Sequence, residues 1–362
     1  MTLPVAPPQT SLQDIAAAVQ PALESFLDER RDLVEPVGPV FTEATAGLER
    51  FVLRGGKRIR PAFAWAGWLA GGGEAAGDVA RSALRACASL EFVQACALIH
   101  DDIIDASLTR RGFPTTHREF AQLHAERGWS GSSEKFGEAT AILLGDLALA
   151  WADDMFLGAG LAPERYLRAA RAWAAMRTEV LGGQVLDIVS EASRDESEDA
   201  AERVVRFKTA GYTVERPLHV GAALAGASDA AIAALREIGV DLGVAFQLRD
   251  DLLGAFGDPA VTGKPSGDDL RSGKHTPMLA HALATGGDAA AELRGLVGTD
   301  LDDTGVERAR AALRETGAPS AMQARVEELT ARATSALAEA PIDDGARPVL
   351  AGLAAVLVDR AA

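Results

Sequence analysis

Apolar residues recur at every third or fourth position along much of the chain, which is the spacing of one face of an α-helix. The pattern is clearest at residues 12–34, 79–104, 166–189 and 230–256. No segment alternates apolar and polar residues between hairpin turns, as a half-buried strand does. The pattern therefore predicts an all-α fold built from amphipathic or buried helices.

Segments rich in Gly, Ser, Pro and Asp separate these helices and are typical of loops. They lie at residues 69–78, 126–139, 190–202 and 257–277. Residues 1–10 are predicted to be a disordered tail. Because no internal repeat or long linker divides the remainder, we expect residues 11–362 to form a single all-α domain.

The composition excludes some classes of partner. The chain has 362 residues, of which 48% are hydrophobic and 24% are charged, as in ordinary soluble proteins. Its 36 basic and 52 acidic side chains leave a net charge of −16, which argues against nucleic acid and anionic lipid as partners. A protein this acidic that binds an anion needs a local basic cluster or metal ions.

The two cysteines indicate a reducing compartment. If Cys87 and Cys96 share one helix, roughly 13 Å separates them, which is too far for a disulfide. We interpret both as reduced core thiols of a cytoplasmic protein. The N-terminus lacks the features of a signal peptide, and Arg85 and Glu91 interrupt the longest apolar run, so no membrane insertion is expected.

Two groups of aspartates lie at the ends of predicted helices. In LIHDDIIDASLTRRG, Asp101 and Asp105 share one helix face, with Asp102 beside them. In QLRDDLLGAFGD, Asp250 and Asp251 again follow apolar residues. Because crowded carboxylates repel and their oxygens suit Mg²⁺, a bound cation would stabilise either group. A solvated helix end is the alternative interpretation of each motif alone.

Basic clusters lie near both acidic motifs, at residues 53–61, 109–117, 206–213 and 263–274. Glycines in them allow close backbone approach, and the cations suit phosphate. Surface charge would explain any one cluster, but their recurrence in an acidic protein favours one or two diphosphate substrates. No P-loop or nucleophilic triad is evident. Flanking helices rich in Ala, Leu and Val add an apolar tunnel, so an isoprenoid diphosphate is indicated.

These motifs together resemble the polyprenyl synthetase family, the trans-isoprenyl diphosphate synthases. The matching segments, in the family's order, are GGKRIRP, HDDIID followed by RRGFPTTH, FKT, FQLRDD and GKPSGDDLRSGK. The resemblance implies a bundle of long helices around a central cavity, of the isoprenoid synthase type and usually homodimeric. It also implies a prenyltransferase that condenses an allylic diphosphate with isopentenyl diphosphate.

By this resemblance the aspartates of both motifs act with magnesium. Asp101, Asp105 and Asp250 are expected to coordinate Mg²⁺, and Asp102 and Asp251 to support them. Three ions per active site are expected, and Mn²⁺ is expected to substitute.

The resemblance also assigns the basic and polar side chains to two substrates. The residues expected to contact the allylic diphosphate are Arg110, Lys208 and Lys264. Those expected to hold isopentenyl diphosphate are Lys57, Arg60, Gln94 and Arg111. Thr209 and Gln247 are expected near the allylic carbon, and Lys274 is expected to close over the site.

The implied mechanism needs no catalytic histidine. Metal ions and cations stabilise the departing diphosphate, the isopentenyl double bond attacks the allylic cation, and the departed diphosphate takes the proton. We therefore interpret His100 and His117 as structural.

The second motif departs from the family pattern at Gly254, where many members carry a third aspartate. Asp258, Asp268 and Asp269 are the candidates to compensate for it, although none lies at the same helical position. We expect activity to survive this change.

Small residues upstream of Asp101 favour a long product. Cys96 and Ala97 lie one helical turn before it, and Val93 lies one turn further down. We therefore expect geranylgeranyl diphosphate (C20), with longer polyprenyl diphosphates or farnesyl diphosphate as alternatives. Trp151 and Phe156 could also limit the tunnel.

Two other function classes stay open. A class I terpene cyclase also uses a DDxxD motif in a helical cavity, but it lacks a basic site for a second substrate. A non-catalytic prenyl synthase subunit typically lacks one of the aspartate motifs. Consumption of isopentenyl diphosphate by the chain alone, with Mg²⁺, would distinguish a synthase from both.

Overall fold

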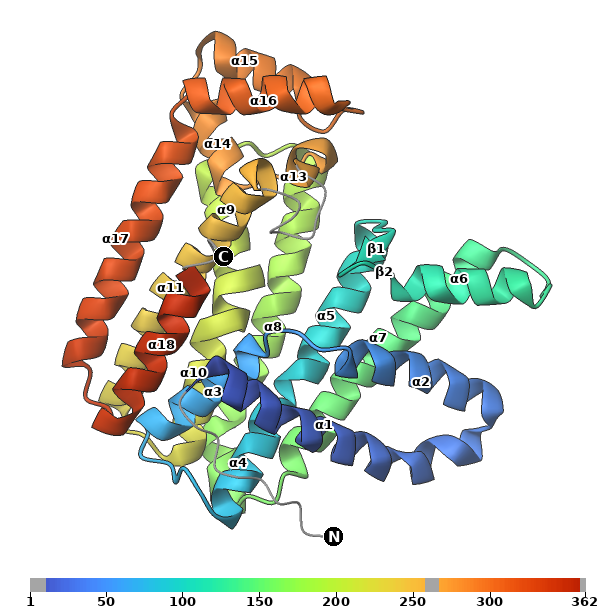
Figure 1. Cartoon of the computed structure of the whole chain (residues 1–362), viewed down its shortest axis with the longest axis vertical. Coiled ribbons are helices and arrows are strands. Elements are labelled where there is room, and N and C mark those ends of the chain that lie inside the picture. Colours follow the sequence, from blue (N-terminus) through green and yellow to red (C-terminus); the bar gives the residue numbers. More distant parts are fainter. Residues whose placement is uncertain (1–10, 258–266, 359–362) are drawn as a thin grey trace. The chain divides into compact units, whose positions relative to one another are not determined.

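The computed structural model describes residues 11–257 and 267–358, and within them the chain is almost entirely helical (Figure 1). This confirms the predicted all-α fold. The strands in this part of the chain, β1 and β2, are two residues long each and form an antiparallel hairpin that the periodicity did not predict.

In chain order the elements are α1 (Leu12–Val34), the 3₁₀ turn η1 (Glu35–Val37), α2 (Pro39–Leu53), α3 (Ile59–Ala70), α4 (Asp78–Ala88), α5 (Leu90–Ile104), β1 (Thr109–Arg110), β2 (Phe113–Pro114), α6 (Thr116–Glu126), α7 (Ser133–Leu157), α8 (Pro163–Ser193), α9 (Glu198–Val204), the π-helix η2 (Val205–Glu215), α10 (Arg216–Ala225), α11 (Asp229–Phe256), α13 (Asp268–Ser272), α14 (Pro277–Ala284), α15 (Gly287–Leu296), α16 (Asp303–Glu315), α17 (Ala318–Glu339), the 3₁₀ turn η3 (Asp344–Ala346) and α18 (Arg347–Val358).

The four helical segments predicted from periodicity are present, with one division. Residues 79–104 form two helices, α4 and α5, because the chain turns at Ser89. The Ser89 side chain is buried and donates to the carbonyl oxygen of Ala86 at 2.6 Å, a local bond that competes with helix continuation. The predicted loop at 126–139 is shorter than expected, since α7 begins at Ser133.

The chain divides into two compact units. The first comprises the described residues up to Arg171 together with 217–228 and 342–349, and the second comprises 172–216, 229–341 and the following part of α18. The single domain expected over 11–362 stays a prediction. The tail expected at residues 1–10 lies outside the described residues.

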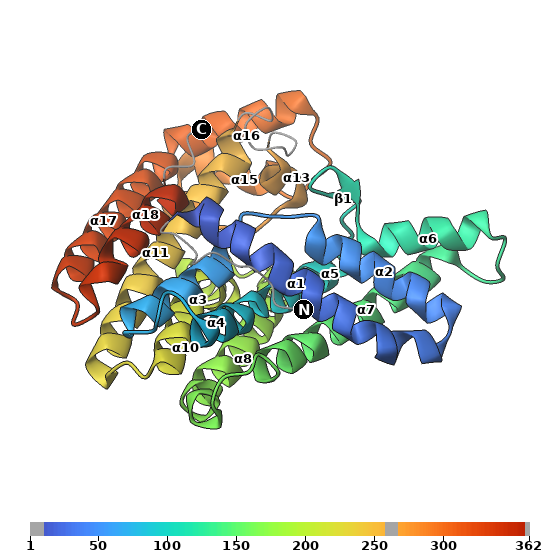
Figure 2. The ribbon, with the colours of Figure 1, turned by 60° about the horizontal axis from the view of Figure 1, so that its bottom comes forward.

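In the first unit, α5 packs beside α7 (Figures 1 and 2). Phe92 of α5, Trp151 of α7 and Phe26 of α1 form a buried aromatic group with ring centroids 5.2 to 6.3 Å apart, a favourable edge-to-face arrangement. A Cβ on Gly67 of α3 would lie 2.9 Å from the backbone carbon of Leu218, so glycine allows α10 to approach closely. The aromatic contacts of Phe92 fix α5, which carries the first aspartate motif.

In the second unit, α11 packs against η2 on one side and α17 on another. A Cβ on Gly239 would lie 2.6 Å from Cα of Glu215, and one on Gly243 would lie 2.7 Å from Cα of Ala210. This glycine pair, one helical turn apart, therefore brings the backbone of η2 onto α11.

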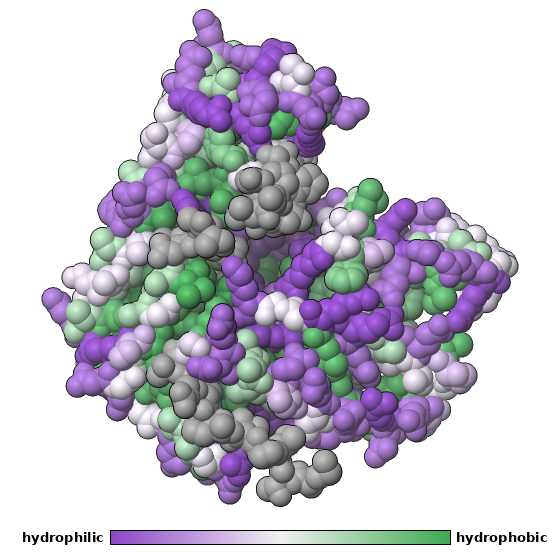
Figure 3. Space-filling model, viewed as in Figure 1, coloured by the Kyte–Doolittle hydropathy of each residue, from purple (hydrophilic) through white to green (hydrophobic). Residues whose placement is uncertain are grey.

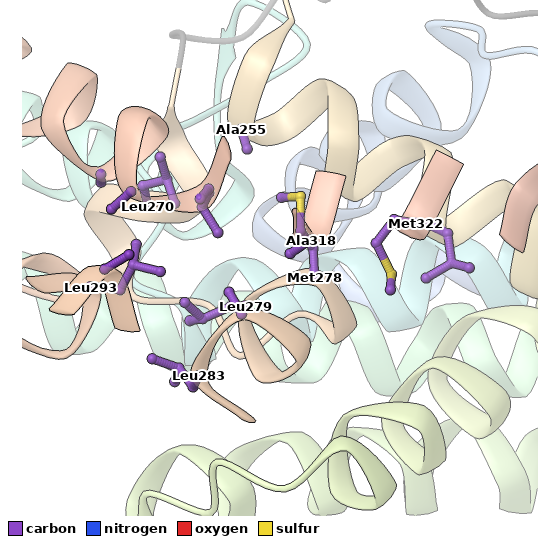
Figure 4. Close-up of a cluster of buried hydrophobic side chains, with 14 of the residues drawn as sticks. Ala255, Leu270, Met278, Leu279, Leu283, Leu293, Ala318 and Met322 are labelled. Carbon is purple, nitrogen blue, oxygen red and sulfur yellow. The ribbon is translucent and has the colours of Figure 1, made fainter. Parts of the chain in front are cut away.

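An apolar cluster holds the C-terminal helices of the second unit together. Met278, Leu279, Ala318 and Met322 belong to it and are buried (Figure 4). The surface over α15 and α16 is mainly hydrophilic (Figure 3). The apolar faces of these two helices are therefore turned toward the cluster, as hydrophobic burial favours.

One helical stretch, Asp78–Ile104, is long and apolar enough to cross a membrane, but 72% of its most apolar window is buried inside the molecule. It covers α4 and α5, which form part of the protein core. Cys87 and Cys96 in this stretch are free and buried, as predicted. Burial, with a smaller contribution from Asp146, raises the pKa of the Cys96 thiol to about 12, so it stays protonated.

Candidate active site

The first aspartate motif lies at the C-terminal end of α5, directly before the β1–β2 hairpin (Figure 1). Asp101 and Asp105 occur one turn apart on one face, as predicted, and the Asp105 N–H donates to the Asp101 carbonyl at 2.8 Å. Asp101 is half-buried and Asp105 is exposed. Their carboxylates therefore lie on the accessible side of the helix end.

Asp102 points the other way and is fully buried. Its Oδ1 accepts a hydrogen bond from Nε of Arg110 at 2.7 Å, and the same guanidinium lies 3.4 Å from Asp101. Burial raises the pKa of Asp102, and the hydrogen bond from Arg110 opposes this effect. Asp102 thus holds Arg110 of the hairpin against the helix end, in a structural supporting role.

The GGK loop before α3 meets the hairpin at Arg111. The Arg111 guanidinium donates to the carbonyl of Gly55, and a Cβ on Gly56 would lie 3.2 Å from it. Burial lowers the pKa of Arg111, and the positive charges of Arg58 and Arg60 contribute to the decrease. The structure therefore brings the predicted basic side chains of segments 55–61 and 110–111 into one cluster.

A buried ion pair that the sequence did not single out supports this loop. Arg58 lies at the N-terminus of α3 with φ of 50° and forms an ion pair with Glu91 of α5. Its guanidinium also donates to Gln20 at 2.9 Å and to the carbonyl of Val52 at 2.8 Å. Because the pair joins the GGK loop to α5, it positions the neighbouring Lys57, which is exposed.

The residues predicted to set product length lie on different faces of α5. Residues of a helix turn by about 100° per position, so Gln94 and Ala97 fall on the face of Asp101; both are half-buried. Val93 is fully buried. Cys96 faces α7 instead, with its Sγ 3.8 Å from Nδ1 of His100. Ala97 is therefore the small residue one turn below Asp101 on its own face.

In the second unit, Lys208 and Thr209 lie within the π-helix η2, a conformation often found at functional sites. Nζ of Lys208 contacts Oδ2 of the buried Asp187 at 2.5 Å. A Cβ on Gly183 would lie 2.6 Å from Cα of Lys208. Helix α8 thus supplies the carboxylate that pairs with Lys208. At Gly183 it also lacks a side chain, which lets the backbone of Lys208 pack closely against it.

The second aspartate motif ends α11. Asp250 is half-buried and Asp251 is buried, and Nε2 of Gln247 donates to Oδ1 of Asp251 at 2.7 Å. Burial raises the pKa of Asp251, and the positive charge of Lys274 opposes this. Despite the burial of its ammonium, Lys274 has a raised pKa because Asp251, Asp269, Asp187 and Asp250 surround it with negative charge.

The polyprenyl synthetase family model matches residues 43–315, which include both aspartate motifs. The chain belongs to the polyprenyl synthetase family. Geranylgeranyl diphosphate synthase of Mycobacterium tuberculosis is 36% identical over 288 residues, covering 79% of this chain and 75% of that protein. Geranylfarnesyl diphosphate synthase of Aeropyrum pernix is 32% identical over 311 residues, covering 84% and 91%.

A solved structure agrees with this assignment. It is a geranylgeranyl pyrophosphate synthase from Corynebacterium glutamicum, complexed with isoprenyl diphosphate and magnesium. The two proteins are 46% identical, with a TM-score of 0.92 over 96% of this chain and 99% of that one. These likenesses confirm the predicted isoprenoid synthase fold and the predicted enzyme class, a chain-elongating trans-prenyltransferase.

The donor atoms of this polyprenyl synthetase suit magnesium. Within 11–257 and 267–358, no three Asp, Glu, His or Cys side chains form a group that could hold a metal ion. Carboxylates such as Asp101 and Asp105 are hard oxygen donors, and Mg²⁺ sites usually combine one or two of them with substrate phosphate and water. The motif therefore fits a hard cation that is bound together with a diphosphate.

Sequence reasoning missed Asp187 and Glu91 as supporting residues. Asp187 could have been noticed as a lone carboxylate in the apolar run GGQVLDIV, since acids are rarely buried without a partner. Glu91 carried the same signal, since it interrupts the apolar run at residues 83–99. Lys264, with Asp258 and the side chain of Asp268, lies outside the described residues.

Proposed function

We propose that this prenyltransferase makes geranylgeranyl diphosphate (C20) from an allylic diphosphate and isopentenyl diphosphate. The observation that carries the chain-length proposal is Ala97, a small residue on the Asp101 face of α5. A prenyl tail that starts at Asp101 would meet no bulky side chain one turn down. The relatives named for the C20 product support this choice, and the geranylfarnesyl (C25) relatives make a longer product the alternative.

In the proposed reaction, residues of the first unit hold the two diphosphates. Arg110, kept in place by Asp102, binds the allylic diphosphate. Lys57, Arg60, Gln94 and Arg111 bind isopentenyl diphosphate. Different neighbouring residues hold the two sets of cations, so each diphosphate can be oriented independently. A reaction between two bound substrates requires such orientation.

Residues of the second unit stabilise the departing diphosphate. Lys208, Lys264 and Lys274 supply positive charge to it, and Thr209 and Gln247 orient the allylic carbon. Bound magnesium, held by Asp101, Asp105 and Asp250, supplies Lewis-acid stabilisation of the diphosphate oxygens. We propose three ions per site, with Mn²⁺ able to substitute.

The carbon–oxygen bond of the allylic substrate breaks and its electron pair leaves with the diphosphate. The isopentenyl double bond then donates its electrons to the allylic cation, forming the new carbon–carbon bond. A proton is lost from the resulting cation to the released diphosphate, and a new double bond forms. Because the diphosphate is the base, neither His100 nor His117 takes part; His100 instead contacts the carbonyl of Ile142 at 3.1 Å.

We also propose a homodimer located in the cytoplasm. On α8, Leu181, Val185 and Val189 recur at four-residue spacing and are 48%, 58% and 55% exposed. An apolar stripe of this kind is typical of an interface with another protein surface. The two free thiols support a reducing compartment. Sedimentation of wild type and Val185→Glu would test the dimer, which the charge is expected to weaken.

The experiment that tests the function is a product assay. Purified protein and Mg²⁺ are incubated with labelled isopentenyl diphosphate and dimethylallyl, geranyl or farnesyl diphosphate in turn, and the dephosphorylated alcohols are sized. A C20 alcohol is expected from each primer. A C25 or longer ladder would overturn the chain length but keep the reaction, and no incorporation with any primer would overturn the reaction.

A further inference from the structure

Two residues of the π-helix η2 pack against the same side of α11, although five positions separate them. Cα of Glu215 lies 2.6 Å from where a Cβ on Gly239 would stand. Cα of Ala210 lies 2.7 Å from where a Cβ on Gly243 would stand. In an α-helix, residues five positions apart point about 140° away from each other, whereas the hydrogen bonds of a π-helix join residues five apart and keep them close. The packing of η2 on α11 therefore depends on the π register.

An ion pair within η2 shows the same register. Nη2 of Arg206, near the start of the helix, lies 2.7 Å from Oε2 of Glu215, at its end. The nine positions between them make about two turns of a π-helix, which has about 4.4 residues per turn, so the two side chains share one face. The same nine positions make about two and a half turns of an α-helix, which would place the side chains on opposite faces. The pair is therefore compatible with the π register and not with the α register.

Glu215 is the centre of this arrangement, and it is completely buried. Nε of Arg236, on α11, donates to its Oε1 at 2.9 Å, so two arginines share one carboxylate. The side chains of Arg206 and Arg236 stay 27% and 40% exposed. A buried carboxylate is costly without a cation beside it. The charge of Glu215 thus joins the start of η2 to its end, and the end of η2 to α11.

Helix α8 holds the end of η2 from another direction. Arg216, the residue after η2, is buried, and its Nε donates to Oε2 of Glu179 on α8 at 2.7 Å. Its N–H donates to the carbonyl of Gly211, five residues back, as in a π turn. A Cβ on Gly211 would lie 3.1 Å from Nη1 of Arg206 and 3.5 Å from Oε2 of Glu179. Both ion pairs therefore pass beside this glycine and hold the final π turn.

Lys208 and Thr209 lie between the two ends that Arg206 and Glu215 join. Nζ of Lys208 contacts Oδ2 of Asp187 on α8 at 2.5 Å. Each residue turns by about 100° in an α-helix and by about 80° in a π-helix. A change of register over the seven positions from Lys208 to Glu215 would therefore rotate one relative to the other by roughly 130°. Such a rotation would take the ammonium of Lys208 away from Asp187.

We propose that Glu215 is a positioning residue for the prenyl transfer: its pair with Arg206 holds η2 in the π register and thereby sets where Lys208 lies. Glu215 touches no substrate in this role. Its effect reaches the reaction through Lys208, so the inference rests on the proposed function, in which Lys208 supplies charge to the departing diphosphate. Arg236 differs from Arg206, because it belongs to α11 and does not join the two ends of η2.

Matched arginine variants test the proposal. Arg206→Met and Arg236→Met each remove one partly exposed cation from Glu215, but only the first breaks the pair along η2. Arg206→Met is expected to lower kcat about tenfold or more, because a small misplacement at the reacting centre has an effect of that size. The KM for isopentenyl diphosphate should stay within about twofold of wild type, since Lys208 serves the other diphosphate. Arg236→Met should keep kcat within about twofold of wild type.

Two further variants separate the pair from general damage. Arg206→Lys keeps a cation beside Glu215 and is expected to retain most of the kcat. Arg206→Met combined with Glu215→Gln should lower kcat no further than Arg206→Met alone, because both changes remove the same pair. Melting temperatures show whether each variant is folded, and the partly exposed Arg206 provides the test if Glu215→Gln does not fold.

Chemical labelling reports the position of Lys208 without turnover. Each folded protein is treated briefly with acetic anhydride, and mass spectrometry compares acetylation of Lys208 with that of the exposed Lys135 on α7. The contact with Asp187 should protect Lys208 in wild type. Faster labelling of Lys208 is expected in Arg206→Met and Glu215→Gln, and the wild-type rate is expected in Arg236→Met.

The proposal is overturned if Arg206→Met and Arg236→Met lower kcat equally, or if Lys208 of folded Arg206→Met is labelled at the wild-type rate. Elongation by wild type is measured in parallel with the three primers. Absence of any prenyl product from wild type would overturn the proposed function, whereas the labelling would still decide whether the Arg206–Glu215 pair positions Lys208.

Discussion

Nε of Arg110 donates a hydrogen bond to Oδ1 of Asp102 at 2.7 Å, although the two residues belong to different elements. This contact gives Asp102 a different role from the other aspartates of the first motif. Asp101 and Asp105 are turned to the accessible side of α5, while Asp102 is buried and anchors the hairpin arginine. One aspartate of the DDxxD motif therefore positions a cation, and we propose that the other two bind the metal ion.

Asp102→Asn should separate these roles. The change removes a buried charge that pairs with Arg110, so we expect a loss of about 1–3 kcal/mol in the free energy of unfolding. A displaced Arg110 should raise the KM for the allylic diphosphate more than the KM for isopentenyl diphosphate. Urea unfolding and steady-state kinetics with each substrate varied measure both effects.

Asp105→Asn is the matched control, because this carboxylate is exposed. It should lower kcat at limiting Mg²⁺ and leave the unfolding free energy within about 0.5 kcal/mol of wild type. Equal destabilisation by Asp102→Asn and Asp105→Asn would contradict the division of roles.

The Arg58–Glu91 pair should behave as one buried unit. Arg58→Met alone or Glu91→Leu alone leaves an uncompensated buried charge, which costs about 3–5 kcal/mol. The double variant should be more stable than either single variant, because no buried charge stays without a partner. Urea unfolding of all four proteins gives the coupling energy, and additive losses would show that the two side chains act independently.

Alanine substitutions at two adjacent glycines of α8 should have opposite effects on the free energy of unfolding. Gly183→Ala places a Cβ 2.6 Å from Cα of Lys208, and overpacking of this kind costs about 1–3 kcal/mol. Gly182→Ala meets no atom within 4 Å and should stabilise the helix by up to about 1 kcal/mol. Urea unfolding measures the stability of each variant, and steady-state kinetics measure its kcat. We expect only Gly183→Ala to lower kcat, because only that change displaces Lys208.

Ala97→Phe should shorten the product. The phenyl ring would stand one turn below Asp101 on its own face, so chain growth should stop near C15. Cys96→Phe is the contrasting variant, because Cys96 faces His100 and α7, and it should destabilise the protein instead. Sized alcohols and melting temperatures distinguish the two, and an unchanged product from a folded Ala97→Phe protein would contradict this account of the tunnel.

The pH dependence of stability should include a contribution from His117. Burial lowers its pKa below the ordinary value of 6.5, so the folded protein binds fewer protons at this site than the unfolded chain. The contribution is fully present above about pH 6.5 and is lost as the pH falls through the lowered folded-state pKa. Urea unfolding between pH 7 and 5 should show a smaller decrease for His117→Asn, which keeps a polar group near Thr115.

Local patterns predicted much of this protein because they depend only on neighbouring residues. Periodicity predicted the helix at 12–34 to its bounds, and i, i+4 spacing put Asp101 and Asp105 on one face. The ordered motifs predicted the family. The π-helix that carries Lys208 was not predicted, since its register depends on packing against α11 at Gly239 and Gly243.

Which carboxylate does what depends on distant parts of the chain. The sequence by itself determined that aspartates, arginines and lysines of the right kinds follow apolar helices in the family's order, because side-chain chemistry and helical spacing are local properties. Only the tertiary structure decided that Asp102 turns inward to Arg110, that Asp187 meets Lys208 and that the carboxylate of Asp269 lies where a Cβ on Gly254 would stand. Each of those contacts forms when separate segments bury their apolar sides together, and no local pattern carries that information.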